Sequence, residues 1–485
     1  MARGTPLQDV LFQYGVEFPC GGIGECQGCR VRILQGTLPV TPEQHNELAP
    51  EQLEAGWRLS CCCRADEDLT LELAQWDAQI LIDNTSFGFV PREGLGIAVD
   101  LGTTTLAAQL LDLHTANVLA VKTALNAQAR YGSDLMSRIN QAVTNGKRTE
   151  LKQAIRKQLG ELVSDLLEEA RGNADRVSDI VIVGNTAMHH LFCGLNVDSL
   201  SQYPFIPTDP DEKRFGGGDL GWSAVADAQV RFVSCIGGFV GSDILSGVRA
   251  CRLKESVELV GLIDLGTNGE IVLGNRDRLV CCSTAAGPAF EASSLSMGMR
   301  AMTGAITQVR VEGGTLTCRV AGGGKPVGIC GSGIVDAVAA ALDLGLIGPR
   351  GKITGGGTSI VLAEHVTMTQ QDIREVQVAK AAIAAGVRIL LDTLGASLGD
   401  LSKIYLAGAF GNYVNRESAH RIGLLVMPPS LIHPSGNTAL LGAKLALFDT
   451  DESPDNELVR SIQHVPLNAH PKFQDIFVEE MTFPE

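Results

Sequence analysis

The sequence contains no run of 18 or more apolar residues, the length that a membrane-spanning helix needs. Its first residues lack a basic start, an apolar centre and a small-residue cleavage site, so we predict no secretory signal peptide and expect a cytoplasmic protein. Positive charge is also in deficit, because 39 Lys and Arg face 55 Asp and Glu, a net charge of −16. This balance argues against a nucleic-acid partner and against an anionic membrane surface.

What is present suits a globular protein. The chain has 485 residues, of which 45% are hydrophobic and 19% charged, and this length predicts about two to four domains. The 13 cysteines are the first strong signal, since six of them lie before residue 64. Because disulfides are rare in the cytoplasm, such clustering favours metal ligands or redox groups.

Three cysteines fall in one glycine-rich segment with the spacing C-x5-C-x2-C. After 31 intervening residues comes a run of three more cysteines. The first gap is one residue longer than in plant-type ferredoxins. Glycines let the backbone curl tightly and bring N–H groups towards the sulfurs. The pattern therefore predicts a one-electron [2Fe–2S] cluster in a ferredoxin-like β-grasp module of residues 1–75. The predicted ligands are Cys20, Cys26, Cys29 and Cys61.

The fourth ligand is open among Cys61, Cys62 and Cys63, and we choose Cys61 because the preceding Arg-Leu-Ser resembles the Arg-Leu-Ala-Cys element of ferredoxins. A structural zinc site made from the C-x2-C pair and two cysteines of the later run is the alternative. A disulfide framework is a weaker one. Ferredoxin modules normally begin with a hairpin before the first helix, and here that hairpin is missing or lies upstream.

The sequence pattern changes after the cysteine module. Residues 66–75 read as its last strand and 76–94 as a linker, and from Leu95 strands and helices alternate, which predicts an α/β architecture. The segment Asp-Leu-Gly-Thr occurs twice, at Asp100 and at Asp264, each time after an apolar strand. This internal repeat predicts two related lobes, 95–255 and 256–450, followed by a C-terminal tail, 451–485.

An Asp at a strand end before a Gly-Thr hairpin is suited to phosphate. The Gly makes room for backbone N–H groups around a phosphate, Thr hydroxyls add donors, and the carboxylate can hold Mg²⁺ through its water shell. Two copies facing each other can grip a nucleotide. We predict Asp100 and Asp264 as catalytic residues. The predicted nucleotide-binding residues are Gly102, Thr103, Thr104, Gly266, Thr267, Asn268, Gly238, Gly331, Gly408 and Gly411.

Two of these expectations carry a plainer alternative. Each glycine-rich turn, taken singly, serves backbone packing as readily as ligand binding. His189 and His190 form a pair that could indicate a metal, but they follow a predicted strand on a helix, and we expect a packed or solvated pair.

The two hairpins and Leu406-Ala-Gly-Ala-Phe-Gly411 resemble the superfamily of acetate and sugar kinases, heat-shock chaperones and actin. With a ferredoxin in front, the chain resembles the reductive activators of corrinoid proteins. Further matching segments are Asn126-Ala-Gln128, Gly132–Ile139, Asn185–His189, Thr284–Glu291 and Phe473–Pro484.

This resemblance implies an ATP-dependent electron donor that reduces cob(II)alamin to cob(I)alamin through its cluster. The implied cofactors are the [2Fe–2S] cluster, ATP and Mg²⁺. The implied partners are a corrinoid protein of a methyltransferase or methionine synthase system, an upstream low-potential electron donor and a second copy of the chain. Members of this family have a middle domain between ferredoxin and ATPase, associated with docking the partner. Only residues 76–94 separate the two here, so we expect that middle domain to be absent.

Three other functions fit the same motifs. One is an ATP-driven activator of a radical dehydratase, whose cluster is normally a [4Fe–4S] held inside the ATPase. Another is a small-molecule kinase with a redox-sensing ferredoxin module. The last is a nucleotide-gated binding protein without catalysis.

Overall fold

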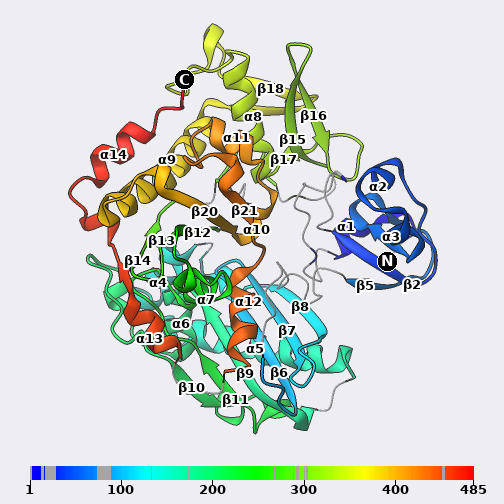
Figure 1. The fold of residues 1–485 in the computed structure, drawn as a ribbon, viewed down its shortest axis with the longest axis vertical. Coiled ribbons are helices and arrows are strands. Elements are labelled where there is room, and N and C mark those ends of the chain that lie inside the picture. The colour runs from blue at the N-terminus through cyan, green and yellow to red at the C-terminus, as the bar shows by residue number, and fades with distance from the viewer. Residues whose placement is uncertain are drawn as a thin grey trace.

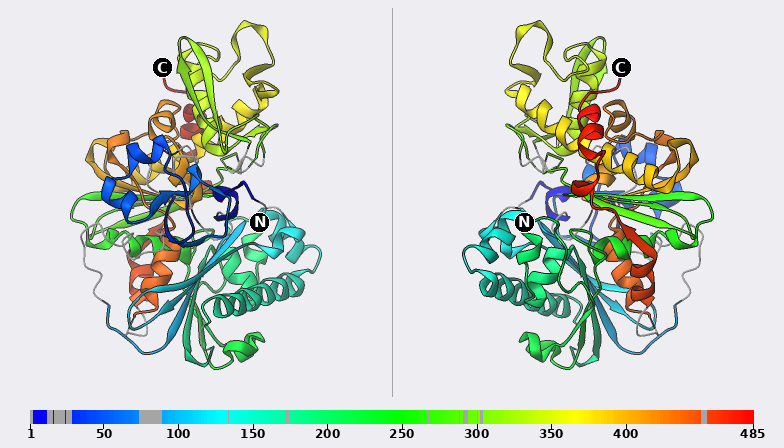
Figure 2. Two further views of the ribbon diagram at one scale, coloured as in Figure 1. Left: turned by 90° about the vertical axis from the view of Figure 1, so that its right-hand side faces the viewer. Right: turned by 90° about the vertical axis from the view of Figure 1, so that its left-hand side faces the viewer.

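A small N-terminal module lies beside a larger body of two lobes, at the level where the lobes meet (Figures 1 and 2). This computed structural model describes residues 3–11, 16, 24, 29–73, 89–132, 134–171, 174–266, 268–287, 289–290, 294–299, 301, 304–449 and 454–485. None of the helices within these ranges is long and apolar enough to cross a membrane.

The N-terminal module is built on the antiparallel sheet β3-β2-β5, with a two-stranded pairing of β1 and β4 beside it. Its core gathers apolar side chains from strands and from α1, and it includes Cys29 and Cys63. The predicted last strand is present as β5. Of the described residues before α1, only β1 forms a strand. The elements are β1 (Thr5–Pro6), α1 (Leu7–Leu11), β2 (Arg30–Gln35), α2 (Pro42–Glu47), α3 (Pro50–Glu54), β3 (Trp57–Leu59), β4 (Arg64–Ala65) and β5 (Thr70–Leu73).

The first lobe is a six-stranded sheet in the order β10-β11-β9-β6-β7-β8. Strands β6, β7 and β8 form an antiparallel meander, and β9 and β11 continue the sheet in parallel with β6. The central strands β6, β7 and β9 are buried along most of their length, as in a sheet that is covered on both faces. Their bounds are β6 (Leu95–Leu101), β7 (Thr105–Asp112), β8 (Val118–Leu125), β9 (Val177–Gly184), β10 (Lys213–Gly216) and β11 (Gln229–Phe232).

The second lobe repeats five of these strands in the sheet β21-β20-β12-β13-β14-β22, and its sixth strand, β22, lies at the opposite edge from β10. Again three antiparallel strands precede two parallel ones, and the registers agree: Asp100 lies opposite Val183 of β9, and Asp264 opposite Ala407 of β20. The predicted duplicated α/β fold is therefore confirmed. The strands are β12 (Leu259–Leu265), β13 (Gly269–Gly274), β14 (Leu279–Thr284), β20 (Leu401–Ala407), β21 (Ile432–Pro434) and β22 (Ile462–His464).

Each sheet has its own helices and its own core. The first lobe carries α4 (Leu135–Val143), α5 (Arg148–Glu169) and α6 (Thr186–Cys193), and the second α8 (Gly331–Asp343), α9 (Gln370–Leu394), α10 (Gly408–Tyr413) and α11 (Arg416–Arg421). An outer part of the second lobe is formed by the sheet β16-β15-β17 and the hairpin β18-β19. These strands are β15 (Ala305–Glu312), β16 (Thr315–Val320), β17 (Gly328–Ile329), β18 (Ser359–Ala363) and β19 (Val366–Thr369).

A third core joins the lobes. Helices α7 (Ser242–Ala250) and α12 (Thr438–Ala446) pack against each other between the two sheets, and their apolar side chains share one cluster with residues of both. Although α12 follows five of the six strands of the second sheet in sequence, it packs on β6 and β9 of the first. The lobes are therefore joined both by the shared core and by α12, a helix that follows second-lobe strands in sequence and packs on the first sheet.

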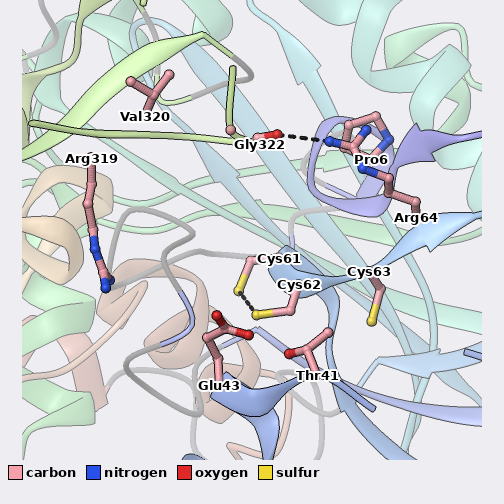
Figure 3. A pocket seen from close by; sticks show the side chains of 11 residues that line it. Pro6, Thr41, Glu43, Cys61, Cys62, Cys63, Arg64, Arg319, Val320 and Gly322 are labelled. Atoms are coloured by element: carbon pink, nitrogen blue, oxygen red, sulfur yellow. Dashed lines mark hydrogen bonds between the residues drawn. The ribbon is translucent and has the colours of Figure 1, made fainter. Parts of the chain in front are cut away.

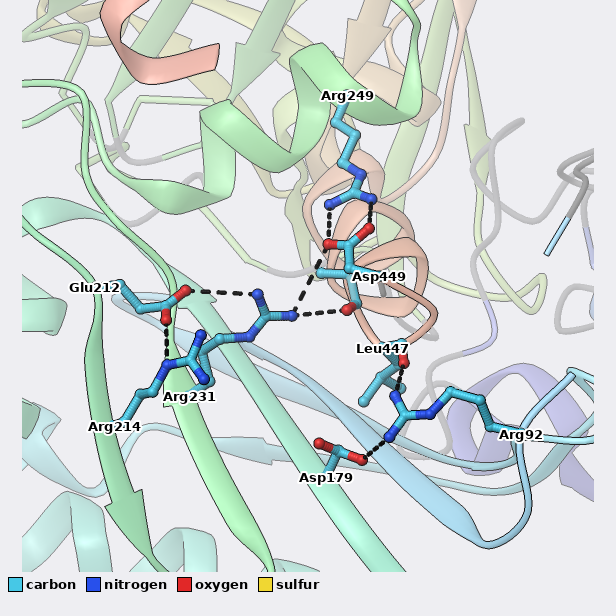
Figure 4. Close-up of polar contacts among 9 residues, drawn as sticks. Arg92, Asp179, Glu212, Arg214, Arg231, Arg249, Leu447 and Asp449 are labelled. Atoms are coloured by element: carbon cyan, nitrogen blue, oxygen red, sulfur yellow. Dashed lines mark hydrogen bonds and ion pairs between the residues drawn. The ribbon is translucent and has the colours of Figure 1, made fainter. Parts of the chain in front are cut away.

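Arginines from the first lobe hold the end of α12 (Figure 4). Arg92 donates to the Leu447 carbonyl at 2.8 Å, and Arg231 donates to the Ala446 carbonyl at 2.7 Å. Arg249 of α7 forms a double contact with the Asp449 carboxylate. Cations at a helix C-terminus also interact favourably with the helix dipole.

The last residues complete the second lobe. Strand β22 pairs with β14, α13 (Pro454–Ser461) precedes it, and α14 (Phe473–Glu480) packs on α9. Phe483 is only 1% exposed, and the Lys380 ammonium group donates to the Thr482 carbonyl at 2.9 Å. The predicted tail thus contributes to the core of the lobe.

We predict that Asp449→Ala lowers the free energy of unfolding by about 2–4 kcal/mol, because the largely buried Arg249 guanidinium loses its carboxylate and Arg231 loses one of two carboxylates, keeping Glu212. Asp449 is 11% exposed in its side chain. Chemical denaturation measures the effect. The matched control is Asp277→Ala, whose ion pair with Arg276 is 80% exposed on the aspartate side and should cost less than about 1 kcal/mol. Equal losses of unfolding free energy in the two variants would show that the contacts of Asp449 stabilise the protein no more than an exposed ion pair does.

Candidate functional site

The described part of the predicted cluster site is a close pair of thiols. Cys29 precedes β2 and Cys61 lies in the short 3-10 turn Ser60–Cys62 after β3, and their sulfurs are 3.3 Å apart. Two thiolates bound tetrahedrally to one metal ion, at ~2.3 Å each, lie about 3.8 Å apart. The pair therefore fits one iron of a two-iron cluster. Cys20 and Cys26, the other two predicted ligands, lie outside the described residues.

The neighbouring cysteines differ in environment (Figure 3). Cys63 is 2% exposed, accepts a hydrogen bond from Gln44 and donates one to the Leu59 carbonyl. Burial raises the pKa of the Cys63 thiol to about 12, so it stays protonated in the core. The Cys62 sulfur lies 3.7 Å from that of Cys61. This geometry favours Cys61 as the fourth ligand, with Cys62 next and Cys63 last.

Within the described ranges, no three His, Cys, Asp or Glu side chains are grouped to hold a metal ion by themselves. Gly24, which lies between the predicted ligands Cys20 and Cys26 in the sequence, comes close to the second cysteine segment. Gly24 has a positive φ of 78°, and a Cβ there would lie 2.7 Å from the Cys62 sulfur. The glycine therefore lets the predicted ligand loop approach the second cysteine segment closely.

In the first lobe, asparagines that cap helices also donate hydrogen bonds to the Asp-Leu-Gly-Thr hairpin between β6 and β7. Asn437, which caps α12, donates to the Asp100 carboxylate at 2.8 Å, and Asn185, which caps α6, donates to the Thr103 hydroxyl at 2.8 Å. Asn126 donates to the Gly102 carbonyl at 2.9 Å. Thr104 is half-buried at the turn. These hydrogen bonds hold the hairpin in place, and Asp100 lies near the end of β6, just before the turn.

In the second lobe, Asp264 lies against the start of α10. Gly408 has a φ of 84°, and a Cβ there would lie 2.5 Å from the Asp264 carboxylate and 2.6 Å from the Leu265 carbonyl. Only glycine fits this approach. The Gly266 N–H donates to the Asn268 carbonyl at 3.0 Å, which makes the turn tight. Thr267 lies outside the described residues.

The other predicted glycines are explained by packing. A Cβ on Gly238 would lie 2.2 Å from the Phe205 carbonyl, and one on Gly331 would lie 1.8 Å from the Phe290 carbonyl. Gly411 packs against Leu406, where a Cβ would lie 3.0 Å from its side chain. His189 and His190 are fully buried on α6, as a packed pair should be.

Two acidic residues that the sequence reasoning missed join the site. Asp243 lies in the first turn of α7 and Glu270 on β13, opposite Asp264 in the register. Asp243 ends a glycine-rich segment and Glu270 follows directly on the second hairpin. Proximity in sequence to those motifs was the available signal.

The pKa of each of these four carboxyl groups is raised mainly by burial, and neighbouring carboxylates raise three of the four values further. Burial raises the pKa of Asp100 to about 6, against the opposing hydrogen bond from Asn437. Burial and the charge of Asp100 raise the pKa of Asp264 to about 7 and, with a contribution from Asp264, that of Asp243 to about 8. The pKa of Glu270 is raised well above its usual range by burial and then by Asp243 and Asp264. Because no three of these carboxyls are grouped closely enough to bind a metal ion directly, the arrangement suits a divalent cation that keeps its water shell.

The fold and site define a class: an actin-like two-lobe ATPase fold preceded by a ferredoxin-like module. Family models match all three parts. Residues 2–66 match a 2Fe-2S iron-sulfur cluster binding domain, 95–256 the RACo middle region, and 258–485 the C-terminal domain of RACo, the ASKHA domain.

Relatives agree along most of the chain. The Corrinoid activation enzyme RamQ of Eubacterium limosum is 35% identical over 83% of this chain and 74% of its own. The [Co(II) methylated amine-specific corrinoid protein] reductase of Methanosarcina barkeri is 27% identical over 80% and 77%. A solved structure, "Reductive activator for corrinoid,iron-sulfur protein", is 28% identical with a TM-score of 0.73, covering 100% of this chain and 96% of that one. The chain belongs to the RACo family of reductive activators of corrinoid proteins.

One expectation is corrected by these matches. We expected the middle domain to be absent, but residues 95–256 match the RACo middle region, which here is the first six-stranded sheet with its helices. The sequence reasoning treated that segment as an ATPase lobe because it carries the first Asp-Leu-Gly-Thr hairpin. The segment is both.

We predict that Cys61→Ser lowers bound iron and sulfide and changes the reduced-state electron paramagnetic resonance (EPR) spectrum, because it removes the thiol nearest Cys29. Cys63→Ala is the matched control and should retain the cluster. Cys62→Ser should retain it as well. A Cys62→Ser protein without a cluster, beside a normal Cys61→Ser protein, would reassign the fourth ligand.

The pH dependence of stability tests the carboxyl cluster. Carboxyls whose pKa is raised on folding contribute most below their unfolded pKa near 4, and this contribution is lost as pH rises through the folded values near 6 to 8. The melting temperature of the metal-free protein should therefore fall from about pH 5 to about pH 8. Asp243→Asn should flatten this fall, whereas Asp277→Asn on the surface should not. Parallel curves for Asp243→Asn and wild type would contradict the shared burial.

Proposed function

We propose that this chain reactivates a corrinoid protein by reducing cob(II)alamin to cob(I)alamin, one electron at a time, with ATP hydrolysis in the cleft between its lobes. Two features in one chain support the proposal. The thiol pair of Cys29 and Cys61 fits one iron of a two-iron cluster, and the two equivalent strand ends place Asp100 near enough to Asp264 to raise its pKa. The names of the relatives support the same reaction. Family membership favours it over a kinase or a dehydratase activator.

On the nucleotide side, we assign Asp100 and Asp264 to Mg²⁺, held through water. Thr103, Thr104, Thr267 and Asn268 donate to phosphate oxygens, with Gly102 and Gly266 giving the backbone room to approach. Asn437 and Asn185 keep the first hairpin in place. A cation bound there would lower the pKa values that burial raises and would offset the repulsion between the carboxylates and the nucleotide phosphates.

On the electron side, Cys20, Cys26, Cys29 and Cys61 hold the [2Fe–2S] cluster, which when bound supplies electrons singly. Plant-type clusters have potentials of roughly −400 mV, and each ~59 mV by which an acceptor lies lower costs about tenfold in equilibrium constant. ATP-dependent closure of two lobes is a two-state change that can be coupled to such an uphill step. The partner is a corrinoid protein of a methyltransferase or methionine synthase system, and a low-potential donor reloads the cluster.

The domain arrangement that goes with this function assigns residues 1–75 to electron transfer and joins them by 76–94 to the ATPase lobes 95–255 and 256–450. Residues 451–485 complete the second lobe. We further propose a homodimer formed through the ATPase part.

The test is anaerobic reduction of a cob(II)-loaded protein. Chemically reduced wild-type protein with MgATP should convert the cob(II) absorbance and EPR signals to those of cob(I). Asp100→Asn and Asp264→Asn should each lower this rate on the order of 100-fold, as expected when a group that organises transition-state charge is removed. Asp277→Asn is the surface control. The proposal fails if neither a methyltransferase corrinoid protein nor a methionine synthase cobalamin domain is reduced.

A further inference from the structure

The cluster module is seated on the second lobe by a narrow set of contacts. Arg64 donates to the Gly322 carbonyl at 2.8 Å, and Gln8 donates to the Ala301 carbonyl at 3.4 Å. Between these contacts and the cysteines lies a pocket of about 410 Å³ that reaches Arg319 of β16 (Figure 3). Among the described residues, these hydrogen bonds join the module to the lobe beside the pocket.

One apolar contact stands apart from these. Tyr413, the last residue of α10, packs against the hydrophobic core of the module. That core also contains Cys29, a predicted cluster ligand with no exposed surface. Tyr413 is thus a side chain of the ATPase that reaches the core of the ferredoxin.

The opposite end of α10 lies in the nucleotide site. Gly408 begins the helix and approaches Asp264 and Leu265 so closely that no side chain fits. A helix of six residues is about 9 Å long. The carboxyl that we assign to Mg²⁺ and the ring that packs on the cluster module are therefore separated by a single short helix.

The packing of α10 makes it suited to move as one piece. Phe410 stacks on Phe290 with ring centres 4.8 Å apart and planes 11° apart, and Gly411 packs against Leu406. The Val414 N–H closes the helix on the Phe410 carbonyl. Close-packed elements shift as units and do not deform gradually, so a displacement at Gly408 reaches Tyr413.

We propose that α10 transmits the nucleotide state of the cleft to the iron–sulfur module, with Tyr413 as the positioning residue that seats the module. The inference rests on the proposed function for nucleotide binding at Asp264, and it adds the route by which that binding reaches the cluster. It requires no corrinoid partner. Nucleotide alone changes the surroundings of the cluster, and hence its potential and its EPR spectrum.

The experiment compares reduced full-length protein with and without Mg²⁺ and a non-hydrolysable ATP analogue. Wild type should show a nucleotide-dependent shift in midpoint potential and in g values. Tyr413→Ala should lose that shift while binding the analogue with an affinity within about twofold of wild type. Tyr413→Phe keeps the ring and should keep the shift. Arg64→Ala, which removes a polar contact of the seat but leaves α10 intact, should also keep it.

A second measurement covers the case in which Tyr413→Ala loses iron. Hydrogen exchange of wild type should then show residues 408–414 and 57–65 changing protection together on adding the analogue. An unchanged potential in wild type that binds the analogue overturns the inference, and so does a full shift in Tyr413→Ala. A shift without reduction of cob(II) protein sinks the proposed function alone. Absence of analogue binding by calorimetry overturns both.

Discussion

Four carboxyl groups lie at or near the ends of the strands that carry the two Asp-Leu-Gly-Thr segments: Glu270 is buried, and Asp100, Asp243 and Asp264 are partly buried. Keeping like charges together in such a place is unfavourable, and here the raised pKa values of Asp100, Asp264 and Asp243 express the cost. The surrounding structure must hold these groups against their repulsion. It does so with helix-capping asparagines on one side and with a glycine that brings backbone against carboxylate on the other.

Helix α12 shows how this constraint spreads. Its first turn is anchored at the carboxyl cluster by Asn437, and its last turn is anchored by Arg92 and Arg231 of the first lobe. The helix comes after five of the six strands of the second sheet in the sequence but packs on the first sheet. A relative movement of the lobes must therefore pass through a shared apolar core, which favours two discrete arrangements over a continuum.

Much of this could be predicted from the sequence, because the informative patterns are local. The repeat Asp-Leu-Gly-Thr predicted two strand ends with the same neighbours, and the registers of β6 and β12 confirm the duplicated fold. Glu270 lies directly across the second hairpin from Asp264, so the strand register could have indicated it. Asp243 was missed because its approach to Asp264 depends on where α7 lies in space. The same non-local reason hid the place of α12. Which of Cys61, Cys62 and Cys63 faces Cys29 likewise follows from side-chain directions that spacing does not contain.

The buried position of Phe483 bears on how the protein is made. Its side chain completes the core of the second lobe, and α12, which covers the first sheet, also comes late in the sequence. Neither lobe can finish packing on a ribosome until nearly the whole chain has emerged, whereas the buried core residues of the iron–sulfur module lie between Leu7 and Ala65 and its last strand ends at Leu73. Domains generally fold as units in the order of synthesis. The electron-carrying module is therefore able to fold, and to receive its iron, well before the machinery that uses it exists.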